Sequence, residues 1–253
     1  MNIVVLTKLV PDLVEELTID ADGNALDLSF ARLIINEFDD HAIEQGILLK
    51  ERGGGSVTII TPDAEGADEV LFTAAAKGAD RIVKVKGDFS SVNNHAFARA
   101  FAKVLNEIHP DLILTGVQAH NDLDGALGPL IAELLEMPYI GYVSAVSIGD
   151  DKAAVKKEYP GGLIAEMDVK FPAVLGIQAA EQPPRYVAIS KVRQAMRTAS
   201  IEERDASDLD PCGGAIIGRM FQPEAAAHAM MITGSADEVA DKLVDVFKEL
   251  GIV

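Results

Sequence analysis

Apolar runs alternate with segments of helical periodicity through the first 140 residues of the chain. Four runs have the length and composition of strands in a sheet: residues 2–7, 56–61, 81–86 and 111–116. Four further segments place apolar side chains at helical spacing: residues 39–52, 63–77, 91–109 and 124–136. Strands and helices that alternate at these lengths form βαβ units. The pattern therefore predicts an α/β fold with a mainly parallel, Rossmann-like sheet.

The pattern changes after residue 139. Four strand-like runs follow one another with short turns between them: residues 139–148, 153–159, 163–170 and 173–179. Because no helix separates these runs, they are predicted to be antiparallel additions to the sheet. Residues 183–223 have no clean period and contain Pro, Gly and mixed charge, which predicts an extended arm or loops.

Two local signals lie near the ends of the chain. Residues 22–24 (DGN) are turn-prone and predict a hairpin over residues 18–28. Ser235 and Glu238 form a capping box at the start of a predicted helix over residues 237–250. The apolar side chains of that helix form one stripe, which we expect to be buried against another surface.

Charge and composition limit the classes of partner. Among 253 residues, 40 acidic side chains against 22 basic ones give a formal net charge of −18. Phosphate backbones and anionic membranes attract clustered Lys and Arg, so broad nucleic-acid or membrane-surface binding is disfavoured. No apolar run approaches the roughly 20 residues that span a bilayer. The single cysteine, Cys212, cannot form an internal disulfide, so we expect a cytoplasmic protein without direct membrane insertion.

The usual sequence signatures of catalytic and metal sites do not occur. The five histidines show no metal-ligand spacing, and Cys212 has no CxxC partner. No GxSxG motif, no GK[ST] and no Gly-rich loop that opens a helix is found. We therefore expect neither catalytic residues nor a metal site in this chain.

The position of the loops indicates a candidate binding site. In a doubly wound sheet, ligands bind beyond the carboxyl ends of the strands, where the strand order reverses. Four loops lie at such ends: residues 7–11, 36–39, 61–63 and 116–128. The last is small and polar, and it leads into a helix whose free amides could hold a phosphate. The sequence thus predicts a nucleotide site; the alternative is a set of ordinary loops with Asp124 as a helix N-cap.

A basic segment stands out in this acidic chain. Between residues 185 and 197 there is no acidic residue, and basic and apolar side chains alternate: Arg185, Ile189, Lys191, Val192, Arg193, Met196 and Arg197. Such a segment suits docking to an acidic partner. The alternative is a solvated surface stretch without a binding role.

Residues 155–186 (VKKEYPGGLIAEMDVKFPAVLGIQAAEQPPRY) carry a specific resemblance. They resemble the signature of the β subunit of electron transfer flavoprotein, in which V-K-x-E is followed by GG-L, a strand, P-A-V and P-R-Y. Further segments are similar to family motifs: residues 36–39 (NEFD), 73–80 (TAAAKGAD), 116–119 (GVQA) and the closing helix over 237–251. The resemblance covers essentially the whole chain.

The resemblance implies an electron carrier subunit and not an enzyme. The family's β subunit has an adenine nucleotide α-hydrolase-like core and forms a heterodimer with a larger α subunit that binds FAD. It buries AMP, or a second FAD in bifurcating members linked to NADH. Electrons would come from acyl-CoA-type dehydrogenases and pass to a membrane quinone oxidoreductase. Residues 1–182 would form the nucleotide-binding core; residues 183–253 would form a recognition loop, an arm and a helix that dock on the partner.

The resemblance also implies site residues, which we carry over by position. The nucleotide would be bound by Leu6, Asn36, Glu37, Phe38, Asp39, Pro62, Gly116, Gln118, Asn121, Asp122, Asp124, Gly125, Ala126 and Leu127. Leu13 corresponds to the family position near the flavin of the α subunit, and Ile189 to the apolar anchor of the recognition loop. The phosphate loop departs from the family pattern, because Asn121 replaces an Asp and Leu127 replaces a Thr.

A second class of protein shares this core. A stand-alone adenine-nucleotide-binding protein of the universal-stress type has the pattern G-x2-G-x9-G[ST]. Gly125 and Gly128 supply its first part, but Pro138 and Tyr139 stand where Gly and Ser or Thr would be needed. This alternative also assigns no function to residues 139–253.

Overall fold

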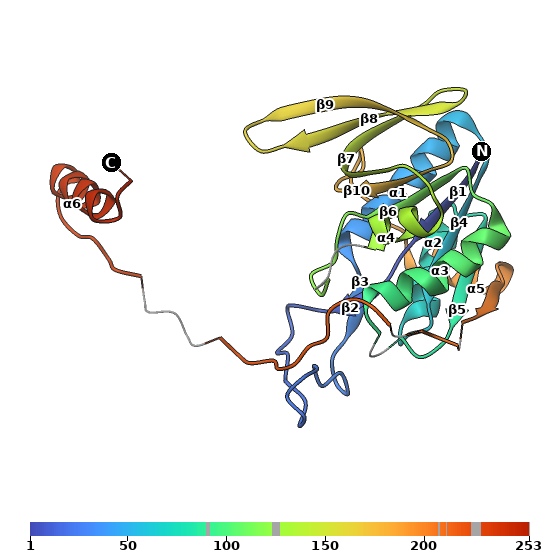
Figure 1. Ribbon diagram of the computed structural model, residues 1–253, viewed down its shortest axis with the longest axis horizontal. Coiled ribbons are helices and arrows are strands. Elements are labelled where there is room, and N and C mark those ends of the chain that lie inside the picture. Colours follow the sequence, from blue (N-terminus) through green and yellow to red (C-terminus); the bar gives the residue numbers. More distant parts are fainter. Residues whose placement is uncertain (90–91, 123–126, 207, 211, 224–228, 253) are drawn as a thin grey trace. The chain divides into compact units, whose positions relative to one another are not determined.

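The computed structural model describes residues 1–89, 92–122, 127–206, 208–210, 212–223 and 229–252. The chain divides into two compact units, Met1–Arg219 and Met220–Val253. The first unit contains a large sheet with helices on its faces (Figure 1). In the part of the chain that the structure describes, no helix is long and apolar enough to cross a membrane.

The central sheet has the strand order β11-β5-β4-β1-β6-β10-β7-β8-β9. Its strands are β1 (Asn2–Leu6), β4 (Ser56–Pro62), β5 (Arg81–Lys86), β6 (Leu112–Gly116), β7 (Tyr139–Ile148), β8 (Lys152–Tyr159), β9 (Leu163–Lys170), β10 (Ala173–Ile177) and β11 (Ile201–Asp205). All neighbours from β11 to β7 are parallel, whereas β8 and β9 are antiparallel. The predicted fold class, a Rossmann-like parallel core with antiparallel additions, is confirmed.

Helices cover both faces of this sheet. Residues of α1 (Glu37–Gly53) and α2 (Ala67–Lys77) pack in one core cluster, and those of α3 (Asn94–Ile108) and α4 (Leu127–Leu134) in another. Strand β1 contributes alternate side chains to each cluster, Ile3 and Val5 to the first and Val4 and Leu6 to the second. This is why its sequence is a continuous apolar run: both faces of the strand are buried.

One predicted strand has a different role from the one expected. Residues 173–179 were expected to be an antiparallel addition, but β10 lies between β6 and β7 and is parallel to both. Every residue of β10 is buried. Its short connection from β9 is typical of a hairpin, which is why the sequence predicts an antiparallel strand. Because β10 is apolar on both faces, it can instead occupy the interior of the sheet.

The prediction of an extended arm from residue 183 is wrong over its first half. Helix α5 (Ile189–Thr198) packs against α2 with Ala195 buried, and β11 pairs with β5 at one edge of the sheet. Strand β11 (IEERD) is highly charged, and Glu202 forms an ion pair with Arg81 of β5 (2.9 Å). An edge strand can expose charged side chains, so its sequence lacks the apolar run that marks an interior strand.

The region after β1 forms a small separate sheet. Strands β2 (Leu9–Pro11) and β3 (Leu33–Ile35) pair antiparallel. Between them, Ile19 pairs with Leu26, as the predicted hairpin requires. The carboxylate of Asp20 accepts the backbone N–H of Gly23 (2.8 Å), and Gly23 has a positive φ of 71°. The turn is therefore stabilised by an Asp side chain and a glycine.

The second unit contains α6 (Ala236–Glu249). Its predicted capping box is confirmed, because Ser235 and Glu238 each accept the other's backbone N–H. No residue of α6 is buried, and Leu243, Phe247 and Leu250 are exposed. The expectation that this apolar stripe is covered by another surface stays a prediction.

Candidate functional site

The strand order of the central sheet reverses between β1 and β6. Strands β4 and β5 continue from one side of β1, and β6 lies on its other side. The carboxyl ends of these two strands, at Thr7–Lys8 and Gly116–Val117, form the edge where doubly wound sheets bind ligands. The first turn of α1 lies at the same edge, where Asp39 contacts both strand ends.

Asp39, in the first turn of α1, joins the two strand ends. Its Oδ2 accepts the backbone N–H of Lys8 (2.9 Å), and its Oδ1 accepts that of Gly116 (2.8 Å). Burial raises the pKa of Asp39 to about 7, against the opposing effect of these two hydrogen bonds. A Cβ at residue 116 would lie 2.4 Å from Asp39 Oδ1, so the approach of helix and strand requires glycine there.

Asp122 holds the loop after β6. Its Oδ1 accepts hydrogen bonds from Lys8 Nζ (2.5 Å) and Asn94 Nδ2 (2.8 Å), and its Oδ2 accepts the N–H of Ala119 (2.7 Å). The side chains of Asp122 and Lys8 are 8% and 11% exposed. The carboxylate is thus turned onto donors of the protein, and it offsets the charge of Lys8.

Asn36 connects the same loop to the start of α1. Its Nδ2 donates to the carbonyl of Gln118 (2.9 Å), and its side chain makes no capping hydrogen bond to α1. The first amides of α1 are therefore left without the usual side-chain cap. At the same edge of the sheet, the hydroxyls of Thr7 and Thr61 are hydrogen-bonded to each other (2.6 Å) and join the ends of β1 and β4.

A cavity of about 640 Å³ lies against the loop after β6. Residues of that loop and of α4, β7, β8 and β9 line it: Val117, Gln118, Ala119, His120, Asp122, Pro129, Tyr139, Ile140, Gly141, Tyr142, Lys157 and Met167. Burial raises the pKa of Tyr139 to about 12. A Cβ at Gly141 or Gly176 would lie 2.5 Å from the Tyr139 hydroxyl, so these glycines make room for the tyrosine.

The structure brings some of the predicted nucleotide residues together. Asn36, Asp39, Gly116, Gln118 and Asp122 are linked by the hydrogen bonds described above. Other predicted residues are placed nearby or elsewhere. Glu37 and Asn121 are exposed, Phe38 is half-buried, Leu6 and Leu127 belong to the core, and Pro62 ends β4. Asp124, Gly125 and Ala126 lie outside the described residues.

Sequence reasoning missed two residues of this edge. Lys8 is the second residue after β1, and Asn94 begins α3; both donate to Asp122. The sequence could have indicated Lys8, because it lies in the loop of residues 7–11, which the sequence predicts at the carboxyl end of a strand. Asn94 gave none, since its contact to Asp122 depends on the packing of α3. Leu13, expected near the partner's flavin, follows β2 and is largely exposed.

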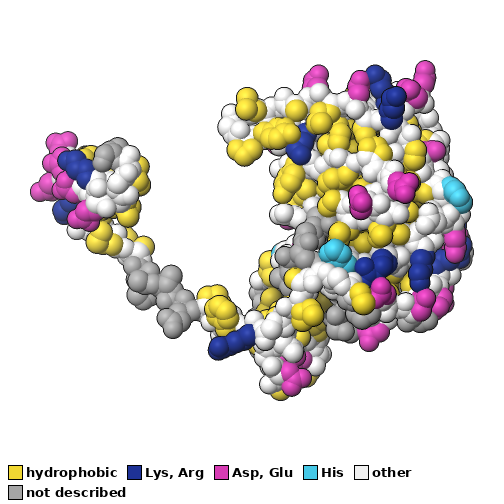
Figure 2. Space-filling model, in the orientation of Figure 1, with side chains coloured by type: hydrophobic (Ala, Val, Ile, Leu, Met, Phe, Trp, Pro, Cys, Tyr) yellow, Lys and Arg dark blue, Asp and Glu magenta, His cyan; other side chains and the backbone are white. Residues whose placement is uncertain are grey.

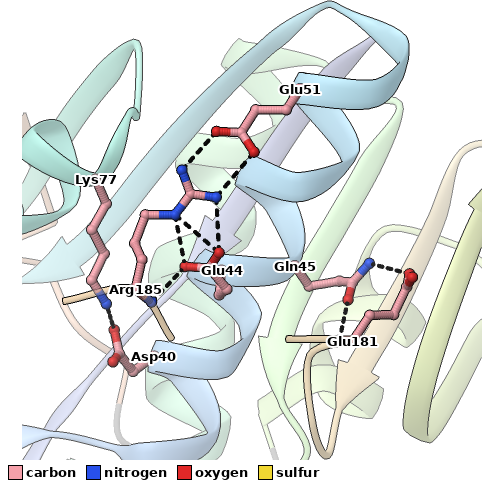
Figure 3. A network of polar contacts seen from close by, with 7 residues as sticks. All are labelled: Asp40, Glu44, Gln45, Glu51, Lys77, Glu181 and Arg185. Carbon is pink, nitrogen blue, oxygen red and sulfur yellow. Dashed lines mark hydrogen bonds and ion pairs between the residues drawn. The ribbon is translucent and has the colours of Figure 1, made fainter. Parts of the chain in front are cut away.

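The predicted docking residues divide into two groups. Ile189, Lys191, Arg193 and Met196 of α5 are exposed, whereas Val192 is half-buried. In the second group, Arg185 is held by two glutamates of α1 (Figure 3). Its guanidinium contacts Glu44 (2.8 Å) and Glu51 (2.6 Å).

The contacts of Arg185 belong to a polar network along α1. The Arg185 N–H donates to Glu44 Oε2 (2.9 Å), and the Glu44 side chain is only 2% exposed. Hydrogen bonds from Arg185 lower the pKa of Glu51, and the two glutamates raise the pKa of Arg185. In the same view, Glu181 contacts Gln45, and Lys77 of α2 contacts Asp40 (Figure 3). The network fixes the segment that leads to α5.

Comparison with known proteins identifies the family. The family model named "Electron transfer flavoprotein domain" matches residues 28–209. The electron transfer flavoprotein subunit beta of Methylophilus methylotrophus is 30% identical, and the match covers 98% of each chain. The chain belongs to the electron transfer flavoprotein family, as a β subunit.

Other relatives extend this result. The electron transfer flavoprotein subunit beta of Thermoanaerobacterium thermosaccharolyticum is 33% identical over 83% of this chain and 80% of its own. The caffeyl-CoA reductase-Etf complex subunit CarD of Acetobacterium woodii is 29% identical, and each chain is covered completely. Membership implies that the β subunit associates with a flavin and pairs with an α subunit. The matches do not favour the stand-alone universal-stress alternative, which leaves the residues after 139 unused.

Proposed function

We propose that this β subunit forms a heterodimeric electron carrier with an FAD-binding α subunit and binds AMP or a second FAD at the reversal point of its sheet. The observation that carries the proposal is the polar edge between β1 and β6, built from Asn36, Asp39, Gly116, Gln118 and Asp122. Every one of these residues was predicted from the family's nucleotide site.

The donor set at this edge fits an adenine nucleotide. The carboxylates of Asp39 and Asp122 accept hydrogen bonds from the protein, so they are not aimed at a phosphate. The first amides of α1 have no side-chain cap, and helix N-termini favour anions. The neighbouring cavity of about 640 Å³ lies within the range of roughly 300–1,000 Å³ that is typical of small-molecule sites.

The flavin supplies the redox chemistry, since it accepts and releases electrons while the protein positions it. The residues of this chain then have binding and positioning roles. Asn36, Gln118 and the start of α1 would hold the nucleotide, and Leu13, which follows β2, would lie near the flavin of the α subunit. The exposed residues of α5 would contact the electron donor.

We place acyl-CoA-type dehydrogenases before this carrier and a membrane quinone oxidoreductase after it. One relative is named as a subunit of a caffeyl-CoA reductase complex, which supports a donor or acceptor that acts on a CoA thioester. In α5, Ile189 and Met196 are exposed beside Arg193. Apolar side chains bordered by positive charge suit a hydrophobic site on an acidic partner.

The experiment is to co-express the chain with the α subunit of the same organism and to count the bound cofactors. We expect a 1:1 complex with one FAD and either one AMP or a second FAD per heterodimer. A chain that stays free of the α subunit in sedimentation contradicts the carrier role. A heterodimer that contains FAD but no nucleotide attributable to the β subunit contradicts the nucleotide site alone.

A further inference from the structure

Helix α5 has little of its own to fix its position. It has ten residues, and an isolated helix of this length is marginal in water. Ala188 precedes it without a side-chain cap, and Ala195 is its one buried residue. Apart from packing against α2, its side chains form no hydrogen bond or ion pair to another element among the described residues. The position of α5 therefore depends on the segments on either side of it.

The chain after α5 is fixed by the sheet. Only residues 199 and 200 separate the helix from β11, which pairs with β5 along its whole length. Glu202 of β11 also accepts two hydrogen bonds from the guanidinium of Arg81 (2.9 and 3.0 Å). Because the backbone pairing already sets this end of α5, the contact of Arg81 is not needed for its position.

The chain before α5 is fixed by side chains of α1. Pro183 and Pro184 have no backbone N–H, so the segment there cannot join a ladder of backbone hydrogen bonds. Arg185 follows them, and its N–H donates to Glu44 Oε2 (2.9 Å). Residues 186–188 alone separate Arg185 from Ile189, where α5 begins. The position of Arg185 therefore sets where the helix begins.

The guanidinium of Arg185 binds two carboxylates at once (Figure 3). Its Nε and Nη2 donate to Glu44 (3.0 and 2.8 Å), and its Nη1 and Nη2 donate to Glu51 (2.6 and 3.0 Å). The two glutamates are seven residues apart on α1, which is about two helical turns. A planar guanidinium offers this set of donors, whereas the ammonium of a lysine is a compact point charge that cannot serve both carboxylates. The contacts fix both the place and the direction of the Arg185 side chain.

The basic side chains of α5 have different surroundings from those of Arg185. Over much of the face shown in Figure 2, basic side chains lie beside acidic ones. Arg185 has surroundings of this kind, because the groups that its guanidinium contacts are carboxylates. Lys191, Arg193 and Arg197 form no ion pair with any described residue. Arg185 thus serves the fold, whereas the basic side chains of α5 are available to a partner.

We propose that Arg185 is a positioning residue for electron transfer from the dehydrogenase: by binding Glu44 and Glu51, it holds α5 where Ile189 can contact the donor. Arg185 itself does not contact the donor. This inference rests on the proposed function, in which the exposed residues of α5 form the docking surface. It adds a residue outside that surface on which docking depends.

Arg185→Lys tests position without a change of charge. The lysine keeps a counter-charge for the buried Glu44 but cannot bind both glutamates. Arg81→Lys is the matched control, because it removes a guanidinium contact of the same kind beside the other end of α5. Each variant is prepared as the heterodimer with the α subunit. The donor is the acyl-CoA dehydrogenase of the same organism, and flavin reduction at two ionic strengths gives kcat and the KM for the heterodimer.

We expect Arg185→Lys to raise the KM for the heterodimer about fivefold, while kcat and the salt dependence change less than about twofold. Arg81→Lys should leave the KM within about twofold of the wild-type value. Added to Ile189→Ala, Arg185→Lys should raise the KM by less than about twofold, because no apolar anchor is left to position.

Three results would overturn the inference. A wild-type KM in Arg185→Lys would mean that the two glutamates do not position α5 through Arg185. An equal increase of the KM in Arg81→Lys would mean that both arginines support the fold in general. An effect of Arg185→Lys that stays about fivefold in the Ile189→Ala background would mean that Arg185 acts independently of the anchor. If the wild-type heterodimer takes no electrons from the dehydrogenase, the proposed donor fails and the inference fails with it.

Hydrogen exchange gives a measurement that depends neither on the donor nor on the folding of Arg185→Lys. Glu51→Ala removes the exposed carboxylate and leaves the pair of Glu44 and Arg185 intact. In the heterodimer, we expect the amides of α5 to exchange about fivefold faster in this variant, whereas those of β11 keep their wild-type rates. Unchanged exchange in α5 would show that the contact between Glu51 and Arg185 does not hold the helix, and it would overturn the inference.

Discussion

Asp39 holds the two central strands together at the point where they end. Its two oxygens accept hydrogen bonds from the backbone N–H groups of Lys8, which follows β1, and of Gly116, which ends β6. A buried carboxylate in this position is costly to ionise, so the pKa of Asp39 is raised to about 7. Asp122 holds the loop after β6 in a similar way, by accepting hydrogen bonds from the side chains of Lys8 and Asn94.

The raised pKa of Asp39 predicts a pH dependence of stability. The folded chain keeps this proton between the ordinary value of 3.8 and about 7, a range in which the unfolded chain releases it. The contribution of Asp39 to stability is therefore full below about pH 4 and is lost as the pH rises through 7. Asn does not titrate and keeps one of the two acceptors.

We expect the free energy of unfolding of the wild type, relative to Asp39→Asn, to fall between pH 4 and pH 8. A shift of about three units corresponds to at most about 4 kcal/mol. Denaturant titrations of both proteins across this range measure the difference. A difference that is constant or rises with pH contradicts the assignment.

Helix α1 connects the candidate site to the basic segment of residues 185–197. One end, at Asn36 and Asp39, contacts the strand ends, and further along the helix Glu44 and Glu51 hold Arg185. Arg185 precedes α5 by only a few residues. The basic segment therefore does not act as one unit: its first arginine is a structural anchor, and the exposed side chains of α5 are available for a partner.

Arg185→Leu should destabilise the fold by about 2–3 kcal/mol. The substitution leaves the buried carboxylate of Glu44 without its counter-charge, and breaking a buried pair typically costs about 3–5 kcal/mol. The arginine is itself partly exposed, which reduces this value. Glu51→Gln is the matched control, because Glu51 is exposed and its loss should cost less than about 1 kcal/mol. Thermal or denaturant unfolding measures both; equal small effects would mean that Glu44 does not need Arg185.

At the scale of the whole molecule, the net charge of the chain and the local charge of α5 act on an acidic partner in opposite directions. The chain has a net charge of −18, whereas the exposed part of α5 is basic. An acidic partner is repelled by the molecule and attracted by this segment. At 0.1 M salt, charges interact over only about 10 Å, so the local attraction acts at short range.

We predict that Ile189→Ala and Arg193→Glu slow electron transfer from the dehydrogenase in different ways. Loss of the apolar anchor should weaken binding by about 2 kcal/mol, or roughly thirtyfold, with little change in the salt dependence. Charge reversal should lower the association rate and make it less sensitive to added salt, because fewer basic side chains (Lys191 and Arg197) remain to attract the partner. Flavin reduction against dehydrogenase concentration at two ionic strengths measures both. Wild-type kinetics in both variants would mean that α5 has no docking role.

The sequence by itself determined the parallel core, because strands buried on both faces must be continuous apolar runs and their helices must carry an apolar stripe. It also determined the loops at the strand ends, the hairpin turn at Asp20 and the cap at Ser235, since these depend on neighbours in the chain. Tertiary structure decided what local patterns do not encode. Strand β10 lies in the interior of the sheet, and the charged strand β11 lies at its edge. Lys8, Asn94 and Arg185 contact carboxylates that are distant in the sequence. Such contacts depend on which elements become neighbours, and the periodicity of a segment carries no information about its neighbours.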